Sequence, residues 1–445
     1  MSGSRHTQFL VIFLTILLST IGFGVCIPVL PIYAEQMHAT EFENGLLIGV
    51  FSLMVMIASP LWGKLSDRVG RRPVLIFSIL GSAAGYFIMG AAGHIIGTVA
   101  TALPWLFVAR IVDGASGGNV ATAQAYIADI TEPENRSKAM GMIGAAFGLG
   151  FVIGPAIGGI LSGPPKTGWI RSLFGQHAID WWTANGTHLP FYFVALLCVI
   201  NAAMVFLYLP ESLTPEMRRG AHTEKPIAEV FQHADSQLFI TVTLCYFVCL
   251  AAFSIMTAEF ALFGLHRFDL DARHVGYIMA LIGIIAVIMQ GGVIRRLLPK
   301  YGEVKMARSG MVILLFSFIF LPLVGSMGTL LLVSSFIAIG NSLVQPTLNG
   351  LASRAVDGPW QGRALGLLQS AASLGRGIGP IMGGLLLRMD VKDGVRIPLY
   401  GRTPFWVAAV LMVITLYFAM NLRIPHRAAV VVAGTDADAA PAAEL

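Results

Sequence analysis

Charged residues are scarce in this sequence. Asp, Glu, Lys and Arg make up 12% of its 445 residues, whereas hydrophobic types make up 56%. A soluble globular domain carries roughly 25% charged residues, so this chain has too little charge to cover a soluble surface. The charges also gather in short stretches between long apolar runs. This pattern excludes a soluble enzyme and a disordered chain, and it indicates a polytopic membrane protein.

Cysteine is rare, and several functional motifs are missing. Cys26, Cys198, Cys245 and Cys249 all lie in apolar runs, without the spacing of a metal site or a disulfide framework. We interpret them as small buried hydrophobic residues. The sequence has no GxxxxGK[ST] loop for ATP and no hydrolytic constellation. We therefore expect no enzyme activity, no metal, no cofactor and no nucleic-acid partner.

Twelve apolar stretches are long enough to cross a bilayer, which needs about 20 residues. They predict an all-α polytopic membrane protein with twelve transmembrane helices. The expected spans are 9–32, 44–62, 74–94, 103–128, 139–162, 189–209, 237–264, 274–294, 306–325, 329–352, 364–387 and 404–423.

The basic residues indicate how the chain is oriented. With loops assigned to alternate sides, the side that holds both termini carries 19 Lys and Arg, and the other side carries 8. The positive-inside rule then places both termini in the cytoplasm and the protein in the plasma (inner) membrane.

The chain divides into two similar halves. A charged, proline-containing stretch at 210–236 predicts a cytoplasmic linker between an N-terminal bundle (1–209) and a C-terminal bundle (237–427). The Ala-rich end, 428–445, is expected to be a disordered cytoplasmic tail. The motif Gly-x3-Gly-Pro-x2-Gly-Gly at 150–159 recurs 225 residues later at 375–384. Such a duplication is typical of transporters that alternate access to a site between two bundles.

Four motifs carry a family resemblance. The segment GKLSDRVGRR at 63–72 resembles the signature loop of the major facilitator superfamily. The motifs GxGxxxPxxP at 22–31, RxxxGxxG at 110–117 and the Gly-Pro motif at 150–159 resemble those of its drug-efflux members. The run AYIADIT at 125–131 is similar to that of 12-span, tetracycline-resistance-like drug:proton antiporters.

This resemblance implies the major facilitator fold, which consists of two pseudo-symmetric six-helix bundles. It also implies that transport is driven by a transmembrane proton gradient. It also implies membrane acids in spans 1 and 3, where this chain has Ser19 and Gly85.

The loop at 63–72 is interpreted as a cytoplasmic gate. Asp67 can pair with an Arg or accept hydrogen bonds from a helix N-terminus, while Gly63 and Gly70 permit close packing and a sharp turn. Arg71 is expected to reach Asp129. The alternative is a plain topogenic loop. The proposed gate residues are Gly63, Asp67, Arg68, Gly70, Arg71, Arg72 and Asp129.

Proline within spans 5 and 11 predicts helix bending. Pro155 and Pro380 each remove a backbone hydrogen bond, and Gly154 and Gly379 let neighbouring helices approach. A bendable, closely packed helix at the seam between the halves suits a rocking motion. The alternative interpretation is ordinary packing glycine.

Four charges lie well inside spans: Arg110, Asp113, Glu259 and Arg376. Each costs at least ~2.5 kcal/mol at the bilayer centre, so each is expected to face protein or a water-filled cavity. Arg110 and Asp113, three residues apart, are expected to pair, as are Glu259 and Arg376 across two helices. Asp113 or Glu259 is the predicted proton carrier, and both arginines are candidate substrate ligands. A static structural ion pair remains the alternative for Arg110 and Asp113.

Polar amides complete the candidate substrate site. Three of them repeat every four residues in span 10 and form a polar stripe on an apolar helix. They are expected either to line a cavity or to form hydrogen bonds between helices. The candidates are Asn341, Gln345 and Asn349 in span 10, Gln124 in span 4, Gln290 in span 8 and Gln369 in span 11.

Two main functional hypotheses follow. The first is a monomeric secondary active transporter that exports a lipophilic small molecule in exchange for protons. The second is transport of an organic anion or anionic lipid that uses Arg110 and Arg376. A non-transporting receptor or enzyme is a third class, which the absence of a sizeable soluble domain argues against. The expected partners are a small-molecule substrate, protons and the lipid bilayer.

Overall fold

The computed structural model describes residues 5–96, 98, 101–132, 136–164, 175–213, 227–357, 360–392, 395–396 and 400–423. Within these ranges the chain is almost entirely helical. The helices are α1 (Arg5–Gln36), α2 (Glu41–Val69), α3 (Arg71–Ala91), α4 (Ala102–Ser116), α5 (Asn119–Ile130), α6 (Arg136–Leu161), α8 (Gln176–Asn185), α9 (Leu189–Tyr208), η3 (Ile227–Gln232), α11 (Ser236–Phe268), α12 (Ala272–Ile288), η4 (Met289–Val293), α13 (Ile294–Phe320), η5 (Leu321–Leu323), α14 (Met327–Arg354), α15 (Gln361–Met389) and α16 (Thr403–Ala419). Two-residue strands β1 (Val391–Lys392) and β2 (Val395–Arg396) pair antiparallel. Most of the expected linker (214–226) and the whole expected tail (428–445) lie outside the described residues.

Each expected span falls on helical structure. Eight helices of the described part are long and apolar enough to cross a membrane by themselves, and one of these, Ala272–Leu323, includes a turn at Gly302 that divides it into two crossings. The span expected at 103–128 is interrupted after Ser116 and resumes at Asn119. Gly302 has a φ of +73° and Gly70, between α2 and α3, a φ of +121°, a backbone region that favours glycine. The fold is the twelve-helix arrangement that the sequence predicts.

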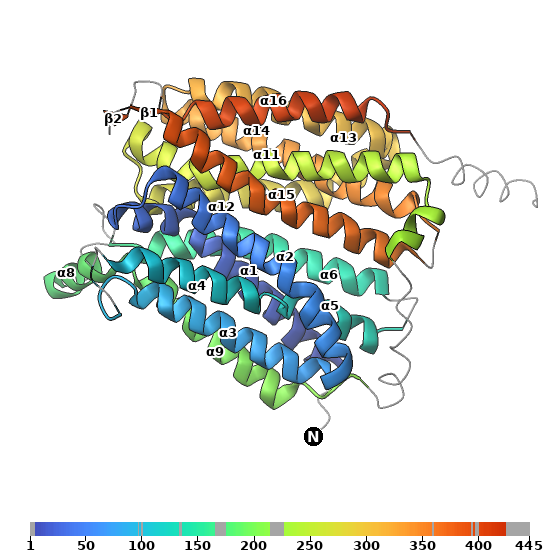
Figure 1. Cartoon of the computed structure of the whole chain (residues 1–445), viewed down its shortest axis with the longest axis horizontal. Coiled ribbons are helices and arrows are strands. Elements are labelled where there is room, and N and C mark those ends of the chain that lie inside the picture. Colours follow the sequence, from blue (N-terminus) through green and yellow to red (C-terminus); the bar gives the residue numbers. More distant parts are fainter. Residues whose placement is uncertain are drawn as a thin grey trace, which may run out of the picture.

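Two hydrophobic cores hold the helices in two groups. One core draws its buried side chains almost wholly from α1 to α9, and the other from α11 to α16 together with residues next to them. Figure 1 shows the first group, in blue to green, below the second, in yellow to red. We call these groups the first half and the second half.

Glycines bring the two halves into backbone contact at two helix pairs, α2 with α15 and α6 with α12. A Cβ atom built on Gly45 of α2 would lie 3.0 Å from Cα of Gly384 in α15. A Cβ atom built on Gly276 of α12 would lie 3.0 Å from Cα of Gly159 in α6. Small residues permit such close helix packing in membranes. These two crossings form the seam between the halves.

Polar contacts also join the halves at the end of the molecule that carries α8 and the β1–β2 ladder, here called the α8 end (Figure 1). His266 Nε2 of α11 lies 2.8 Å from Glu35 Oε1 of α1. The Tyr400 hydroxyl, just before α16, donates to Glu41 Oε1 of α2 at 3.3 Å. Each contact crosses from one half to the other, so this end is closed.

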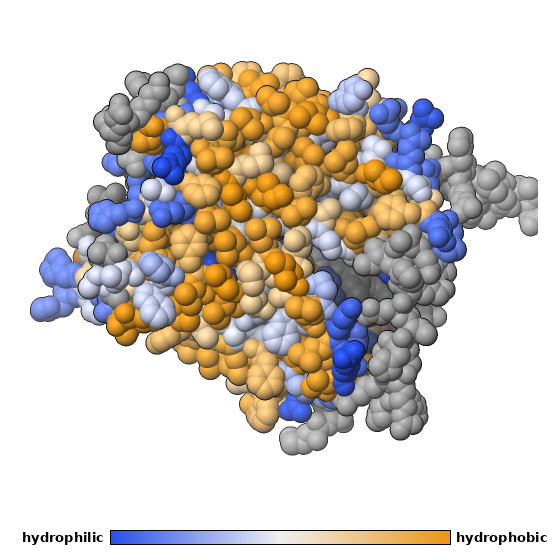
Figure 2. Space-filling model, in the orientation of Figure 1, coloured by the Kyte–Doolittle hydropathy of each residue, from blue (hydrophilic) through white to orange (hydrophobic). Residues whose placement is uncertain are grey.

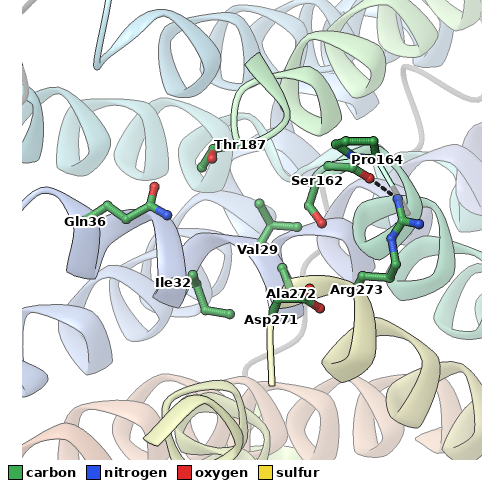
Figure 3. A pocket seen from close by; sticks show the side chains of 10 residues that line it. Val29, Ile32, Gln36, Ser162, Pro164, Thr187, Asp271, Ala272 and Arg273 are labelled. Carbon is green, nitrogen blue, oxygen red and sulfur yellow. Dashed lines mark hydrogen bonds between the residues drawn. The ribbon is translucent and has the colours of Figure 1, made fainter. Parts of the chain in front are cut away.

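Arg273 of α12 adds a further link at the α8 end. Its guanidinium donates to the backbone carbonyl of Ile160 at 2.9 Å and also to that of Gly163. Figure 3 shows Arg273 beside a small pocket that side chains from both halves line. The lining residues are Val29, Ile32, Gln36, Ser162, Gly163, Pro164, Thr187, Asp271, Ala272 and Arg273.

The halves separate toward the opposite end, here called the Gly70 end. Leu53 of α2 still packs close to the position of Gly377 in α15. Closer to the Gly70 end, α2 contacts its own half, where Trp62 Nε1 donates to the Ala115 carbonyl at 2.6 Å. On α15, a Cβ atom built on Gly366 would have open space around it. Figure 2 shows the surface hollowed between the halves on this side, at the right of the view.

An apolar belt crosses the visible face of the molecule between two polar ends. Figure 2 shows hydrophobic residues across the middle of the visible face and hydrophilic residues at both sides. Large apolar side chains such as Phe77, Leu207 and Tyr417 are about two-thirds exposed on the helices. A belt of this kind is suited to contact with lipid tails.

Candidate substrate and proton sites

Arg110 and Asp113 form the expected ion pair on α4. Arg110 Nη1 lies 3.5 Å from Asp113 Oδ2, and the two residues are 1% and 3% exposed. The guanidinium also donates through Nε to the Leu47 carbonyl of α2 at 3.2 Å and lies over the Phe51 ring, 4.3 Å from its centroid. The pair is therefore buried against α2, one of the seam helices.

Asp113 lies beside the position where the family resemblance implies an acid in span 3. A Cβ atom built on Gly85 of α3 would lie 2.9 Å from Cβ of Asp113. A carboxylate thus stands at this place, although it comes from the neighbouring helix. At the position in span 1, the Ser19 hydroxyl accepts a hydrogen bond from Asn119 Nδ2 at 2.8 Å.

The predicted pair between Glu259 and Arg376 is wrong for this structure. Glu259 of α11 packs against Gly383 of α15, where a Cβ atom would lie 2.8 Å from Oε1. Arg376 lies seven residues before Gly383 on the same helix, or about 10 Å along its axis. The sequence estimate placed the two groups about 6 Å apart in depth, within reach of each other, because it could not include how α11 and α15 are shifted along each other.

Glu259 is a fully buried acidic residue of α11. It is 1% exposed, and neither carboxylate oxygen has a hydrogen-bond partner within the described part of the chain. A buried ionised carboxylate without a partner is costly, and proton uptake removes that cost.

Arg376 is half-buried near the middle of α15. Its guanidinium donates to Ser373 Oγ at 3.2 Å, and the Tyr246 phenol of α11 acts on it electrostatically. Tyr246 also accepts a hydrogen bond from Asn349 Nδ2 at 3.3 Å. Arg376 therefore borders the polar stripe of α14.

The amides of that stripe are connected both within α14 and to other helices. Gln345 Nε2 donates to Asn341 Oδ1 at 3.1 Å, and Gln369 Nε2 of α15 donates to Asn349 Oδ1 at 3.4 Å. The amides thus form hydrogen bonds between helices, which was one of the two expectations.

Gln124 and Gln290 form no hydrogen bond with these amides within the described part of the chain. Both side chains are exposed, on α5 and in η4 respectively, as is Gln369. An exposed amide facing lipid would be costly. Their exposure is therefore consistent with the cavity-lining role that the sequence suggested, which stays a prediction.

The signature loop connects helices of the first half. Arg71 Nη1 lies 2.5 Å from Asp67 Oδ1, and Arg71 Nε lies 3.1 Å from Asp129 Oδ2 of α5. The predicted contact between Arg71 and Asp129 is confirmed. All of these partners belong to α2, α3 and α5, so these contacts of Arg71 link helices of the first half to one another.

Glu211, after α9, holds the start of α3. Its two carboxylate oxygens accept from the backbone N–H groups of Arg71 at 2.8 Å and Arg72 at 3.2 Å. An acid at a helix N-terminus compensates the helix dipole. Arg72 in turn donates to the Phe206 carbonyl and lies over the Phe206 ring.

Two glycines of the loop differ in what they do. Gly70 provides the sharp turn, as its positive φ shows. The expectation of close packing at Gly63 is wrong, because a Cβ atom built there would meet nothing within 4 Å. Arg68 is exposed at the surface of the Gly70 end.

The two Gly-Pro motifs occupy equivalent places, each on a seam helix at its contact with another helix of the same half. A Cβ atom built on Gly154 of α6 would lie 2.9 Å from Cα of Gly24 in α1, and one built on Gly379 of α15 would lie 2.8 Å from Cβ of Ser254 in α11. Both helices continue through their prolines, Pro155 and Pro380. The close packing is present, and bending at these sites stays a prediction.

Several residues at these sites were not found from the sequence. They are Glu35, Glu41, Phe51, Glu211, Tyr246, His266 and Tyr400. In the sequence, acids near span ends, such as Glu35 and Glu41, cannot be told from ordinary loop charges. An aromatic residue within a span likewise cannot be told from a residue that only packs. The sequence did contain one signal for the contact between the halves: Glu35 follows span 1 and His266 follows span 7, so both are expected on the same side of the membrane.

Comparisons with known proteins agree with this architecture. Residues 12–380 match the model of the Major Facilitator Superfamily. The chain belongs to this family. It is 28% identical over 423 residues to Multidrug resistance protein 2 of Bacillus subtilis, covering 94% of this chain and 96% of that one. It is 30% identical over 372 residues to the class B tetracycline resistance protein of Escherichia coli, covering 82% and 85%.

Solved structures share the fold of this family member. A bacterial homolog of the human lysosomal transporter Spinster, in an inward-facing and unoccupied conformation, superposes with a TM-score of 0.73 at 16% identity, covering 94% of this chain and 97% of that one. The human organic anion transporter MFSD10 superposes with a TM-score of 0.64 at 22% identity, covering 93% and 99%. The family and these relatives identify the protein as a membrane transporter and not an enzyme.

Proposed function

We propose that this transporter exports a lipophilic small molecule in exchange for protons by alternating access. One observation carries the proposal: each half holds a buried acid against a helix of the seam. Asp113 is paired with Arg110, which donates to Leu47 of α2, and Glu259 packs on Gly383 of α15. Because α2 and α15 must separate when the α8 end opens, the surroundings of both acids change with the conformation.

This geometry supports proton coupling through desolvation. An acid that is buried in one state and wetted in another takes up and releases protons as the protein changes state. Glu259, without a hydrogen-bond partner among the described residues, is the acid whose buried state most needs a proton. Asp113 keeps a cationic partner and serves as the second candidate.

The open Gly70 end is proposed to receive substrate from the cytoplasm. Basic residues of the signature loop, among them Lys64, Arg68 and Arg72, lie at that end, in accord with the positive-inside rule. The relatives whose names refer to multidrug and tetracycline resistance support export of drug-like molecules. Gln124, Gln290, Gln369 and the amides of α14 are proposed to line the site.

A flux assay in sealed proteoliposomes tests the proposal. Ethidium is the lipophilic probe, and an imposed pH gradient is the driving force. The wild-type protein is expected to accumulate ethidium against its gradient only when the pH gradient is present, and Glu259→Gln is expected to remove this accumulation. Accumulation that ignores the pH gradient would contradict proton coupling.

A second function, transport of an organic anion, is favoured by Arg376. Its half-buried guanidinium donates to Ser373 and is connected through Tyr246 to Asn349 of the amide stripe. Under this alternative, Arg376→Gln abolishes uptake of fluorescein, an organic anion, and leaves ethidium transport largely unchanged. Under the main proposal, fluorescein is not a substrate of the wild-type protein.

A further inference from the structure

Glu259 faces a small number of groups that could exchange a proton with it. On the described helices that pack against α11, Glu41 of α2 is the charged group that acts on its carboxylate. The titratable or charged side chains on the α8-end portions of these helices are Tyr33 and Glu35 of α1, Glu41 and Glu43 of α2, Arg273, His274 and Tyr277 of α12, and Arg388 of α15.

Two consecutive glycines of α15 separate Glu259 from Glu41. A Cβ atom built on Gly383 would lie 2.8 Å from Glu259 Oε1, and one built on Gly384 would lie 2.5 Å from the Glu41 carbonyl oxygen. The acid of α11 and the first residue of α2 thus reach α15 at neighbouring positions. Any larger residue at 383 or 384 would push these groups apart.

From Glu41 a line of polar side chains leads to the surface of the α8 end. The Tyr400 hydroxyl donates to Glu41 Oε1 at 3.3 Å, and the Tyr400 ring meets the His266 ring edge-on with centroids 5.3 Å apart. His266 contacts Glu35 at 2.8 Å, and both of these side chains are about four-fifths buried. Groups that bind protons therefore extend from the rim of the closed end to Glu41, and Glu41 lies across Gly383 and Gly384 from the buried acid, on which it acts electrostatically.

The surrounding structure is closed to larger molecules. Backbone contact between Gly45 and Gly384 seals the seam beside Glu41, and Tyr400 is 8% exposed. A substrate cannot pass here in this state, whereas a proton needs only a succession of titratable groups and single waters.

We propose that Glu41 and Tyr400 relay protons between the solution at the α8 end and Glu259, with the Glu35–His266 pair at the mouth of the path. The inference rests on the proton coupling proposed above and assigns its route. The proton from solution binds to a Glu259 oxygen and converts the carboxylate to the carboxylic acid. No other bond forms or breaks, and both relay groups return to their starting protonation states.

The test compares two kinds of transport in the same proteoliposomes. Ethidium accumulation driven by an imposed pH gradient requires proton passage, whereas ethidium exchange at equal pH on both sides requires only the conformational cycle. The variants are Glu41→Gln, Tyr400→Phe and Glu41→Asp. Glu43→Gln is the matched control, because Glu43 lies two residues away in the capping box of Thr40, which glutamine also supports.

Glu41→Gln and Tyr400→Phe are expected to slow gradient-driven accumulation by about tenfold while exchange stays within about twofold of the wild type. Glu41→Asp is expected to restore accumulation, and Glu43→Gln to behave as the wild type. In detergent, proton uptake by Glu41→Gln after a drop in pH is expected to reach the wild-type amount more slowly, since Glu259 is intact and only its access is impaired.

Three outcomes overturn the relay. Wild-type accumulation by both Glu41→Gln and Tyr400→Phe would show that protons take another route, while the proposed function would stand. Loss of exchange together with accumulation would assign Glu41 a purely structural role. Wild-type kinetics of proton uptake in Glu41→Gln would exclude its part in access. Indifference of the wild-type protein to the pH gradient would instead remove the proposed function itself.

Discussion

Gly45 of α2 and Gly384 of α15 meet so closely that a Cβ atom on Gly45 would lie 3.0 Å from Cα of its partner. This contact joins two helices of different halves, 339 residues apart in the chain. It brings backbone against backbone, so neither side has a flexible group that could yield to a larger residue. Both positions consequently restrict what the sequence can carry.

Gly384→Ala is expected to destabilise the closed α8 end. The added methyl group would lie 2.5 Å from the Glu41 carbonyl oxygen, and overpacking of this kind costs about 1–3 kcal/mol. Gly366→Ala on the same helix is the control, because its Cβ position is open. Thermal melting in detergent should show a lower Tm for Gly384→Ala alone, together with a loss of ethidium transport. Equal Tm values for the two variants would contradict the tight seam.

The Arg110–Asp113 pair should show strong coupling in a double-mutant cycle. Arg110→Ala leaves Asp113 buried without its cation, which costs about 3–5 kcal/mol. Removal of both charges in Arg110→Ala/Asp113→Ala is expected to cost less than the sum of the two single changes. Unfolding in detergent, followed by Trp fluorescence, measures the cycle. Simple additivity would mean that the 3.5 Å contact contributes little.

Arg71 is expected to matter more than its basic neighbour Arg68. Arg71→Ala removes the contacts of an 8% exposed residue to Asp67, which is 40% exposed, and to Asp129, which keeps a hydrogen bond from Ser212. The loss of a hydrogen bond to a charged group costs about 1.5–3 kcal/mol. Arg68→Ala changes an exposed side chain and is expected to leave the Tm unchanged. If both variants melt at the same temperature, the loop acts through its charge alone.

We expect the free energy of unfolding to decrease as the pH is lowered, because of His188. Burial and the neighbouring His94 lower the pKa of His188 from 6.5 to about 4, and its Nδ1 lies 3.0 Å from the Tyr33 hydroxyl. The unfolded chain therefore binds more protons than the folded one between these values. The contribution of His188 to stability is constant above the unfolded pKa of 6.5. It is lost as the pH falls from there to about 4.

His188→Asn is expected to flatten this dependence between pH 6.5 and 4. His38→Asn is the control, since His38 is exposed at a φ of +60°, a conformation that asparagine tolerates. Melting curves over this pH range decide the matter. A slope in His188→Asn equal to that of the wild type would assign the effect to other groups.

Local signals in the sequence were enough for the helices and some short-range contacts. Apolar runs located the twelve spans, a glycine among basic residues located the turn at Gly70, and the three-residue spacing of Arg110 and Asp113 predicted their pairing. These features depend on neighbouring residues or on one helix face, so the sequence pattern contains them.

Contacts between distant helices were the ones that the sequence could not supply. The pairing of Glu259 with Arg376 was wrong because the relative height of two helices depends on tilt and packing, and an error of a few residues moves a side chain by about 5 Å. Glu35 and His266 meet although 231 residues separate them. Their contact follows from how the halves dock, and no local pattern encodes it.

Glu211 has one more consequence for the chain that follows α9. Its carboxylate accepts hydrogen bonds from the first two backbone N–H groups of α3. The stretch up to Leu213 is thus tethered to α3 as well as to the end of α9. Because the Ser212 hydroxyl also donates to Asp129 Oδ2 at 2.9 Å, a displacement of this stretch would act directly on the contact between Arg71 and Asp129.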